Sequence, residues 1–272
     1  MGLLLKGGIH WDLAVTAVIA ATAIALWMLS MQALPPGVRP VHSPALQIGC
    51  ALGNTAYFGI PVALTLLPSQ ALPVSIGYDL GATLLAWSVG PFWLQHKAGR
   101  ASNLIRPLLR QLTASPATRG LMAALVVRAT PWHGVVASAL WWPSRVVILL
   151  ALVVVGMRLG AMQSNGVQGI PTIESNPISP APLQLRLALV CKLLLFPAWI
   201  WLFCSLLPLP LLTQQALVLQ GAAPAAISVL LMAEDAERDA DLAAQLILSS
   251  TLMALLSVPI WWFCLLRPLG TP

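Results

Sequence analysis

Two segments of this sequence place helix-breaking and hydrogen-bonding residues inside long apolar runs. They are Gly53-Asn54-Thr55-Ala56-Tyr57-Phe58-Gly59-Ile60-Pro61 and Gln220-Gly221-Ala222-Ala223-Pro224-Ala225-Ala226-Ile227-Ser228. Because proline has no backbone N–H and clashes with the preceding turn, each segment predicts an interrupted helix. The second half of such a helix presents free N–H groups and a positive dipole end, which favour an anion. The residues expected to bind substrate are Asn54, Thr55, Tyr57, Gly59, Pro61, Gly221, Pro224 and Ser228.

The competing interpretation of these segments is a pair of ordinary proline kinks, which are common in membrane helices. Paired breaks in corresponding halves of a chain are instead typical of a transporter site near the middle of the bilayer. Asn and Thr in the first segment add hydrogen-bonding groups at that depth. The pair therefore favours a binding site over two kinks.

Two ionisable residues, Asp79 and Lys192, lie inside predicted membrane spans. Charged groups at such depth are costly and usually functional. We hypothesise that Asp79 binds a coupling proton or helps to bind Na⁺; the alternative is a position near the outer interface, with a hydrogen bond to a neighbour. For Lys192, neutralising a bound anion is less favoured than reaching the cytoplasmic interface with its long side chain.

The composition shows which elements must position these residues. The chain has 272 residues, of which 58% are apolar and 8% are charged, and its mean hydropathy is +0.86. Soluble domains are about 25% charged, so nucleic-acid binding proteins and soluble enzymes are excluded despite the net charge of +6. The four cysteines are far apart, without metal-ligand spacing. We expect no catalytic residues, no metal and no cofactor.

The apolar runs are long and unbroken, which indicates membrane helices rather than the alternating strands of a barrel. We predict an all-α, polytopic membrane helix bundle that forms a single domain over residues 1–272. About eight spans are expected, at residues 13–31, 45–67, 74–94, 116–130, 139–159, 185–207, 211–233 and 242–266.

Basic residues predict the orientation, because they gather in cytoplasmic loops. One side of the predicted bundle collects Arg39, the residues from Lys97 to Arg119, Arg158 and Arg186, whereas the other side collects Lys6, Arg145 and Arg267. The richer side is assigned to the cytoplasm, which places both termini outside. We expect a multi-pass protein of the plasma (inner) membrane.

At these motifs the chain resembles the auxin efflux carrier family. The Gly53–Pro61 segment is similar to that family's Asn-Thr-Gly-x-x-Gly-x-Pro signature, with Ala56 where the family has Gly. Further similarity covers Pro143 to Gly160, Ala222 to Ala226, the acidic stretch after it, and Ser249-Ser250-Thr251 with Pro259.

The resemblance implies ten helices in two inverted repeats, with two broken helices crossing at mid-membrane and Asn54, Pro61 and Pro224 at the crossing. The eight spans align with helices three to ten. Residues 11–94 then hold three helices of the first repeat, 95–119 a basic cytoplasmic loop, and 116–266 five helices of the second repeat. Because two helices are missing, we expect a start codon upstream of Met1; a remnant, or a wall supplied by another subunit, is the alternative.

The sequence therefore predicts a secondary transporter that exports a small organic anion, by alternating access around the two broken helices. Its expected partners are the anion, the lipid bilayer, a coupling H⁺ or Na⁺, and a second copy in a homodimer; no nucleic acid is expected. Two alternatives stay open. One is a truncated or non-transporting membrane protein or assembly partner, and the other is a sodium-coupled symporter like the bile-acid carriers.

Overall fold

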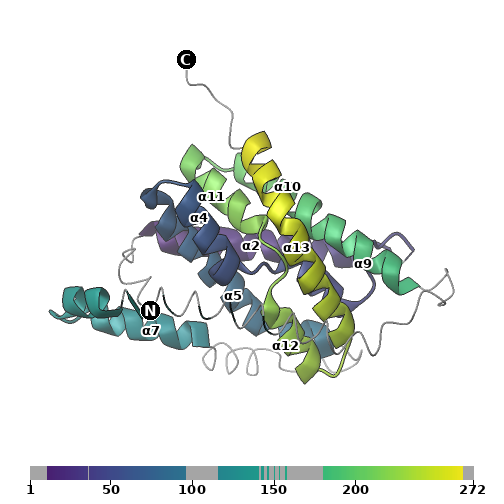
Figure 1. The fold of residues 1–272 in the computed structure, drawn as a ribbon, viewed down its shortest axis with the longest axis horizontal. Helices are drawn as coiled ribbons and strands as arrows, with labels where there is room; N and C mark the ends of the chain where they lie inside the picture. Colours follow the sequence, from purple (N-terminus) through teal and green to yellow (C-terminus); the bar gives the residue numbers. More distant parts are fainter. Residues whose placement is uncertain are drawn as a thin grey trace, which may run out of the picture.

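The computed structural model describes residues 11–35, 37–95, 116–140, six single positions between 142 and 157, and 180–265. This part of the chain is helical, and its one isolated bridge pairs Gly53 with Ala225. The α-helices are α2 (Trp11–Ala33), α3 (Pro44–Ala51), α4 (Ile60–Leu66), α5 (Leu72–Gln95), α7 (Pro116–Arg128), α9 (Pro180–Val190), α10 (Phe196–Ser205), α11 (Leu211–Gly221), α12 (Ile227–Asp235) and α13 (Ala240–Leu265) (Figure 1). Three short helical turns join them: η1 (Thr55–Gly59), η2 (Ser69–Ala71) and η3 (Cys191–Leu195).

Three of the described helices are long and apolar enough to cross a membrane: Trp11–Ala33, Leu183–Ser205 and Ala240–Phe263. Among the other predicted spans, the third forms the 24-residue helix α5, the second and seventh are broken, and the fourth is the 13-residue helix α7. The predicted span over 139–159 falls mostly outside the described residues, as do the basic loop over 95–119 and the loop over 160–182.

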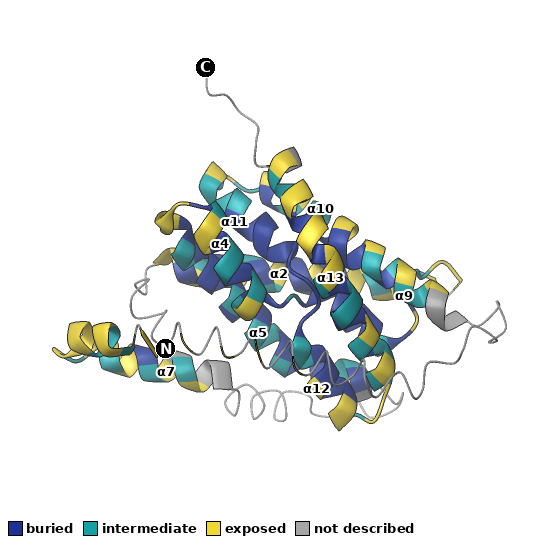
Figure 2. Cartoon of the chain, in the orientation of Figure 1, coloured by how far each residue is buried: buried dark blue, intermediate teal, exposed yellow. Residues whose placement is uncertain are grey.

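Helix α13 shows the surface expected of a lipid-facing helix. Large apolar side chains on one face are exposed, namely Leu252, Leu255, Leu256, Ile260 and Phe263. Their spacing of three to four residues places them along one stripe of the helix. Figure 2 shows exposed residues along the outer side of the bundle and buried residues in its middle. Contiguous exposed apolar surface of this kind favours contact with lipid over contact with water.

Two five-residue π-turns interrupt otherwise helical segments, and each is followed by a proline. η1 leads into α4 with Pro61 in its first turn, and η3 leads into α10 with Pro197 in its first turn. The N–H of the residue before each proline bonds five residues back, from Ile60 to Thr55 and from Phe196 to Cys191. The wider turn thus carries each helix up to its proline without a sharp break.

Small residues let α2 and α5 pack closely. A Cβ on Gly81 would overlap the backbone carbonyl of Ala17, and a Cβ on Gly77 would overlap the Thr16 hydroxyl. Close helix contact through glycine is a common means of association within membranes. Helices α2 and α5 therefore pack directly against each other.

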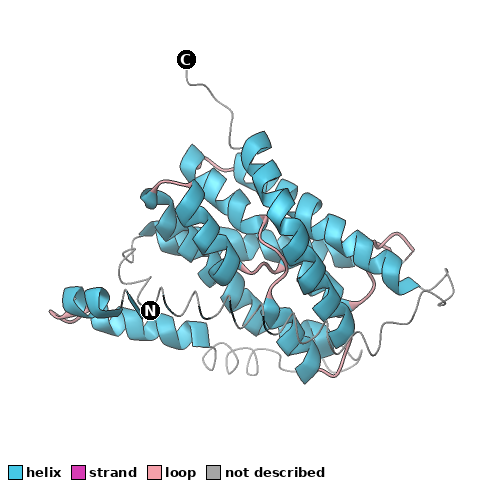
Figure 3. Ribbon diagram, in the orientation of Figure 1, coloured by secondary structure: helices cyan, strands magenta, loops and turns pink. Residues whose placement is uncertain are grey.

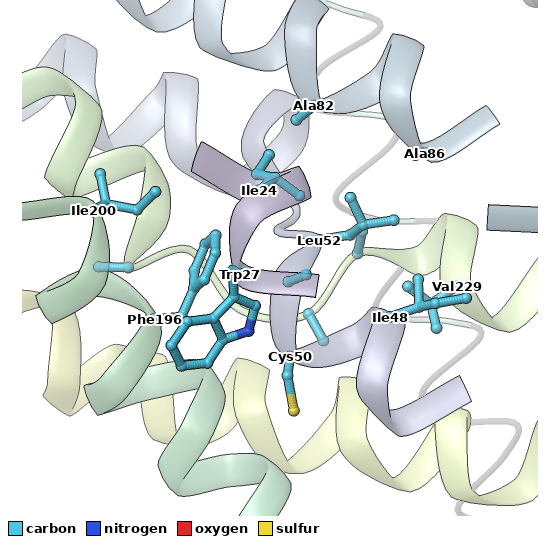
Figure 4. Close-up of a cluster of buried hydrophobic side chains, with 14 of the residues drawn as sticks. Ile24, Trp27, Ile48, Cys50, Leu52, Ala82, Ala86, Phe196, Ile200 and Val229 are labelled. Atoms are coloured by element: carbon cyan, nitrogen blue, oxygen red, sulfur yellow. The ribbon is translucent and has the colours of Figure 1, made fainter. Parts of the chain in front are cut away.

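The core consists of buried side chains from α2, α3, α5 and the elements from α9 to α13. Trp27 of α2 meets the ring of Phe196 edge-on, with their centroids 5.6 Å apart (Figure 4). Indole N–H groups also bind carbonyls inside the bundle, where Trp199 donates to Ala23 at 2.9 Å and Trp261 donates to Leu193 at 2.8 Å. These bonds anchor α10 to α2 and α13 to η3.

The acidic loop between α12 and α13 contacts the start of α3 and the end of α5. Ser43 caps α3 by accepting from the Leu46 N–H, and its hydroxyl donates to the Asp239 carboxylate at 2.7 Å. Arg238 in the same loop donates to the Leu94 carbonyl at 3.3 Å. The start of α3, the end of α5 and the α12–α13 loop are thus held together.

Candidate functional site

The two predicted helix breaks meet, as the sequence indicates. Residues 52–54 separate α3 from η1, and residues 222–226 separate α11 from α12. The two segments run antiparallel: Asn54 N–H donates to the Pro224 carbonyl at 2.7 Å, and Ala226 N–H donates to the Leu52 carbonyl at 3.1 Å. Figure 3 shows loop segments inside the bundle with helices around them. We call residues 52–54 and 222–226 the crossing.

Pro61 does not lie at the crossing, which corrects one sequence-based expectation. The first break ends at Asn54, whereas Pro61 follows η1 and lies in the first turn of α4. The π-turn accommodates this proline, so that it does not itself interrupt the chain. Pro224, in contrast, lies within the second break and accepts the bond from Asn54.

Both outgoing half-helices begin at the crossing without a side-chain cap. The residues at the two N-cap positions are Asn54 for η1 and Ala226 for α12, and neither caps its helix by a side-chain hydrogen bond. Ser228 is half-buried in the first turn of α12. The first N–H groups of a helix have no partner within it, and they carry the positive end of its dipole. Two such ends beside the crossing make a place where an anion is favoured.

Thr55 connects the crossing to Asp79. The Thr55 hydroxyl donates to Asp79 Oδ1 at 2.6 Å, and both residues are largely shielded by the bundle. The alternative to the coupling hypothesis predicted a hydrogen bond between Asp79 and a neighbouring residue. That neighbour is Thr55, the first residue after the break. Asp79 on α5 is therefore placed beside the proposed anion site.

Lys192 points into the bundle, so the expectation that it reaches the cytoplasmic interface is wrong. Its side chain is fully buried, and its ammonium group donates to the Gly221 carbonyl at 3.4 Å. It lies 4.5 Å from the centre of the Phe196 ring. A Cβ on Gly53 would come within 3.2 Å of the same nitrogen. The ammonium group thus adjoins both segments of the crossing.

Gln220 is a buried polar residue that sequence reasoning missed as a site residue. Its side chain is fully buried, and neither its amide oxygen nor its amide nitrogen has a hydrogen-bond partner among the residues that the structure describes. The amide oxygen lies against the α-carbon of Gly59, where a Cβ would overlap it. A buried polar group costs free energy when unpaired. The sequence signal was a glutamine at the edge of the second motif, one residue before Gly221.

Ser250 of α13, which lies in the Ser249-Ser250-Thr251 stretch that resembles the family, supports the second segment. Its buried hydroxyl accepts a hydrogen bond from the Ala225 N–H at 3.0 Å and donates to the Ile247 carbonyl. The hydroxyl therefore satisfies a backbone group that the break leaves free.

The remaining predicted site residues fall into two groups. Gly221 ends α11, and its carbonyl faces Lys192, so it belongs to the crossing. Gly59 packs against Gln220 on the buried side of η1. Tyr57 lies on the other side of that turn and is 37% exposed. Asn54 and Pro224 lie in the crossing, and Thr55, Gly221 and Ser228 lie within two residues of it in the chain. Gly59 is joined to it through Gln220, whereas Pro61 and Tyr57 lie apart from it.

Among the described residues, no group of three or more His, Cys, Asp or Glu side chains could hold a metal ion. The buried thiol of Cys50 donates to the Ala188 carbonyl at 3.4 Å, and Cys191 and Cys204 are also buried and free.

Comparisons with known proteins relate the chain to membrane transport. A family model described as "membrane transport protein" matches residues 5–262. An "uncharacterized transporter" of Methanothermobacter thermautotrophicus is 23% identical over 247 residues, which cover 91% of this chain and 74% of the relative.

Proposed function

The chain belongs to the membrane transport protein family, and from this premise we propose that it is a secondary transporter of a small organic anion. Family membership makes it a polytopic membrane protein and not an enzyme. The observation that carries the proposal is the crossing, where two half-helices begin at Asn54 and Ala226 without a side-chain cap. Helix N-termini that point at a substrate carboxylate are a recurring feature of such transporters.

The substrate carboxylate binds between these two N-termini. The Asn54 amide and the Ser228 hydroxyl offer side-chain donors near the backbone N–H groups of η1 and α12. The Thr55 hydroxyl is already directed at Asp79 and orients that carboxylate. Binding changes which packing of the bundle is favoured, and the crossing then opens to the other side of the membrane.

Asp79 couples transport to a cation. An ionised carboxylate buried with a single hydroxyl donor is costly, and binding a proton or Na⁺ offsets that cost. Because Asp79 is hydrogen-bonded to Thr55, the first residue after the break, occupancy at Asp79 changes the geometry at the substrate site.

The transporter exports its substrate across the plasma (inner) membrane with both termini outside. The excess of basic residues in alternate predicted loops supports this orientation. The exposed apolar stripe of α13 supports a membrane-embedded bundle.

The proposal is tested by thermal unfolding of the purified protein with a panel of carboxylates, including indole-3-acetate and malate. At least one carboxylate should raise the melting temperature of wild type. Asn54→Ala should raise its half-saturating concentration about tenfold, which corresponds to about 1.4 kcal/mol.

Thr65→Ala is the matched control, because this exposed residue lies on α4 and donates within its own helix, to Val62. Its response should equal that of wild type. If no carboxylate stabilises wild type more than Asn54→Ala, the proposed site is wrong.

A further inference from the structure

Lys192 is a fully buried cation whose contacts come from the crossing and from its own helix. Its ammonium group meets the Gly221 carbonyl, the Phe196 ring and the α-carbon of Gly53. In the part of the chain that the structure describes, no carboxylate lies within salt-bridge distance of it. A buried charge without compensation costs several kcal/mol, so Lys192 stays ionised only if another source of negative potential offsets that cost.

The ends of the incoming half-helices supply that potential. Helix α3 ends at Ala51, two residues before Gly53, and helix α11 ends at Gly221. Each C-terminal end carries roughly −0.5 of an elementary charge on its free carbonyls. Two such ends sum to about −1, which one ammonium group neutralises.

The π-turn η3 contains Lys192 and changes which face of the helix is buried after it. An α-helix has about 3.6 residues per turn, so one extra residue in a turn shifts the following face by about 100°. Lys192 and Leu193 are buried, whereas Leu194 and Leu195 are 50% and 48% exposed. The Leu193 carbonyl accepts the Trp261 N–H, which holds the turn against α13.

We propose that the Lys192 ammonium group is the resident counter-charge of the crossing: it neutralises the carbonyl ends of α3 and α11, so that the N-terminal ends of η1 and α12 attract an anion. Without it, the negative and positive helix ends at the crossing would largely cancel. Lys192 is therefore a positioning residue that sets the preference for a charged over a neutral ligand. Its effect on ligands rests on the proposed function, whereas its role as the resident cation does not.

The first test compares ligands that differ only in charge. Thermal unfolding is measured with indole-3-acetate against indole-3-acetamide, and with succinate against succinamide. Wild type should prefer the carboxylate by about tenfold in half-saturating concentration or more. Lys192→Met, which keeps the length but removes the charge, should bring this ratio close to one, while Lys192→Arg should retain most of it.

Arg186→Met is the matched control, because Arg186 is an exposed cation in α9, the helix that leads directly into η3. Its preference for the carboxylate should equal that of wild type. A purely structural role for Lys192 would lower the melting temperature without ligand but leave the ratio unchanged. If Lys192→Met prefers the carboxylate over the amide by the same ratio as wild type, the proposal is wrong.

The second test needs no substrate. Lys192→Ala removes a propylammonium group, so n-propylammonium chloride should stabilise this variant relative to the bulkier choline chloride. Wild type and Arg186→Ala should not distinguish the two salts. If no carboxylate stabilises any variant, the proposed function fails, and this test alone decides on Lys192. Lys192→Ala that responds equally to both salts overturns the proposal.

Discussion

The two broken segments reach the same geometry by different chemical means. In the first, the break at residues 52–54 is followed by a polar π-turn, and Thr55 is bonded to Asp79. In the second, the break at residues 222–226 consists of four alanines and Pro224, and its support comes from Ser250 on another helix. One segment carries side-chain chemistry, and the other supplies mainly backbone.

Both segments therefore supply backbone groups to the crossing, but the second also depends on a side chain from another helix, Ser250. The bonds from Asn54 to Pro224 and from Ala226 to Leu52 are backbone bonds, which no side chain supplies directly. What side chains decide is whether the helix breaks and which groups surround the break. The two segments should therefore respond differently to matched substitutions.

The largest expected difference is between the two prolines. Pro224→Ala creates five consecutive alanines, and alanine is favoured over proline in a helix by about 3 kcal/mol. The break should tend to close into a helix, and carboxylate transport in vesicles should fall about 100-fold. Pro61→Ala should cost less than about tenfold, because proline is tolerated in a first helical turn. Equal losses for both variants would contradict the asymmetry.

Next in size is the loss of support for the second segment. Ser250→Ala leaves the buried Ala225 N–H without its partner, which costs about 1–3 kcal/mol of unfolding free energy. The melting temperature should fall by several degrees. Thr251→Ala is the control, since that hydroxyl bonds only to Ile247 within the same helix. A Ser250 variant as stable as the Thr251 variant would show that the second segment needs no such support.

A smaller effect is expected at the carboxylate that serves only the first segment. Asp79→Asn keeps an oxygen that can accept from Thr55 but loses the charge. Carboxylate-induced stabilisation should persist, while transport driven by a proton or Na⁺ gradient should drop about tenfold toward the rate without a gradient. Transport that responds to the gradient as in wild type would remove Asp79 from the coupling step.

The smallest expected effect concerns the contact between the two segments at Gly59. Gly59→Ala pushes against the Gln220 amide, whose flexible end can shift, so we expect a cost of about 1 kcal/mol. Gln220→Ala should relieve it, and the double-mutant cycle should show coupling of at least about 0.5 kcal/mol. Additive effects would mean that the two residues do not press on each other. Gly221→Ala offers the counterpart, with its Cβ 3.0 Å from Ile200 Cγ1.

Much of the fold could be predicted from local chemistry. Long apolar runs predict helices in a membrane, and the clusters around Asn54 and Pro224 predict the two breaks. That these breaks would meet was implied by the resemblance to the auxin efflux carrier family, because the pairing of the breaks by itself predicted only a binding site. The position of Pro61 could not be predicted in the same way, because a π-turn and a break both accommodate a proline and the sequence does not distinguish them.

The sequence by itself determined that this is a helical membrane protein with two interrupted helices, because hydropathy and proline act within one or two turns of their own position. Only the tertiary structure decided where Lys192 and Gln220 point. Lys192 is buried against Gly53 and Gly221, and Gln220 is buried against Gly59. In addition, the extra residue in the π-turn η3 rotates the helix face that follows it. The bond from the Trp261 N–H to the Leu193 carbonyl in that turn joins segments far apart in the chain, which only the tertiary structure brings together.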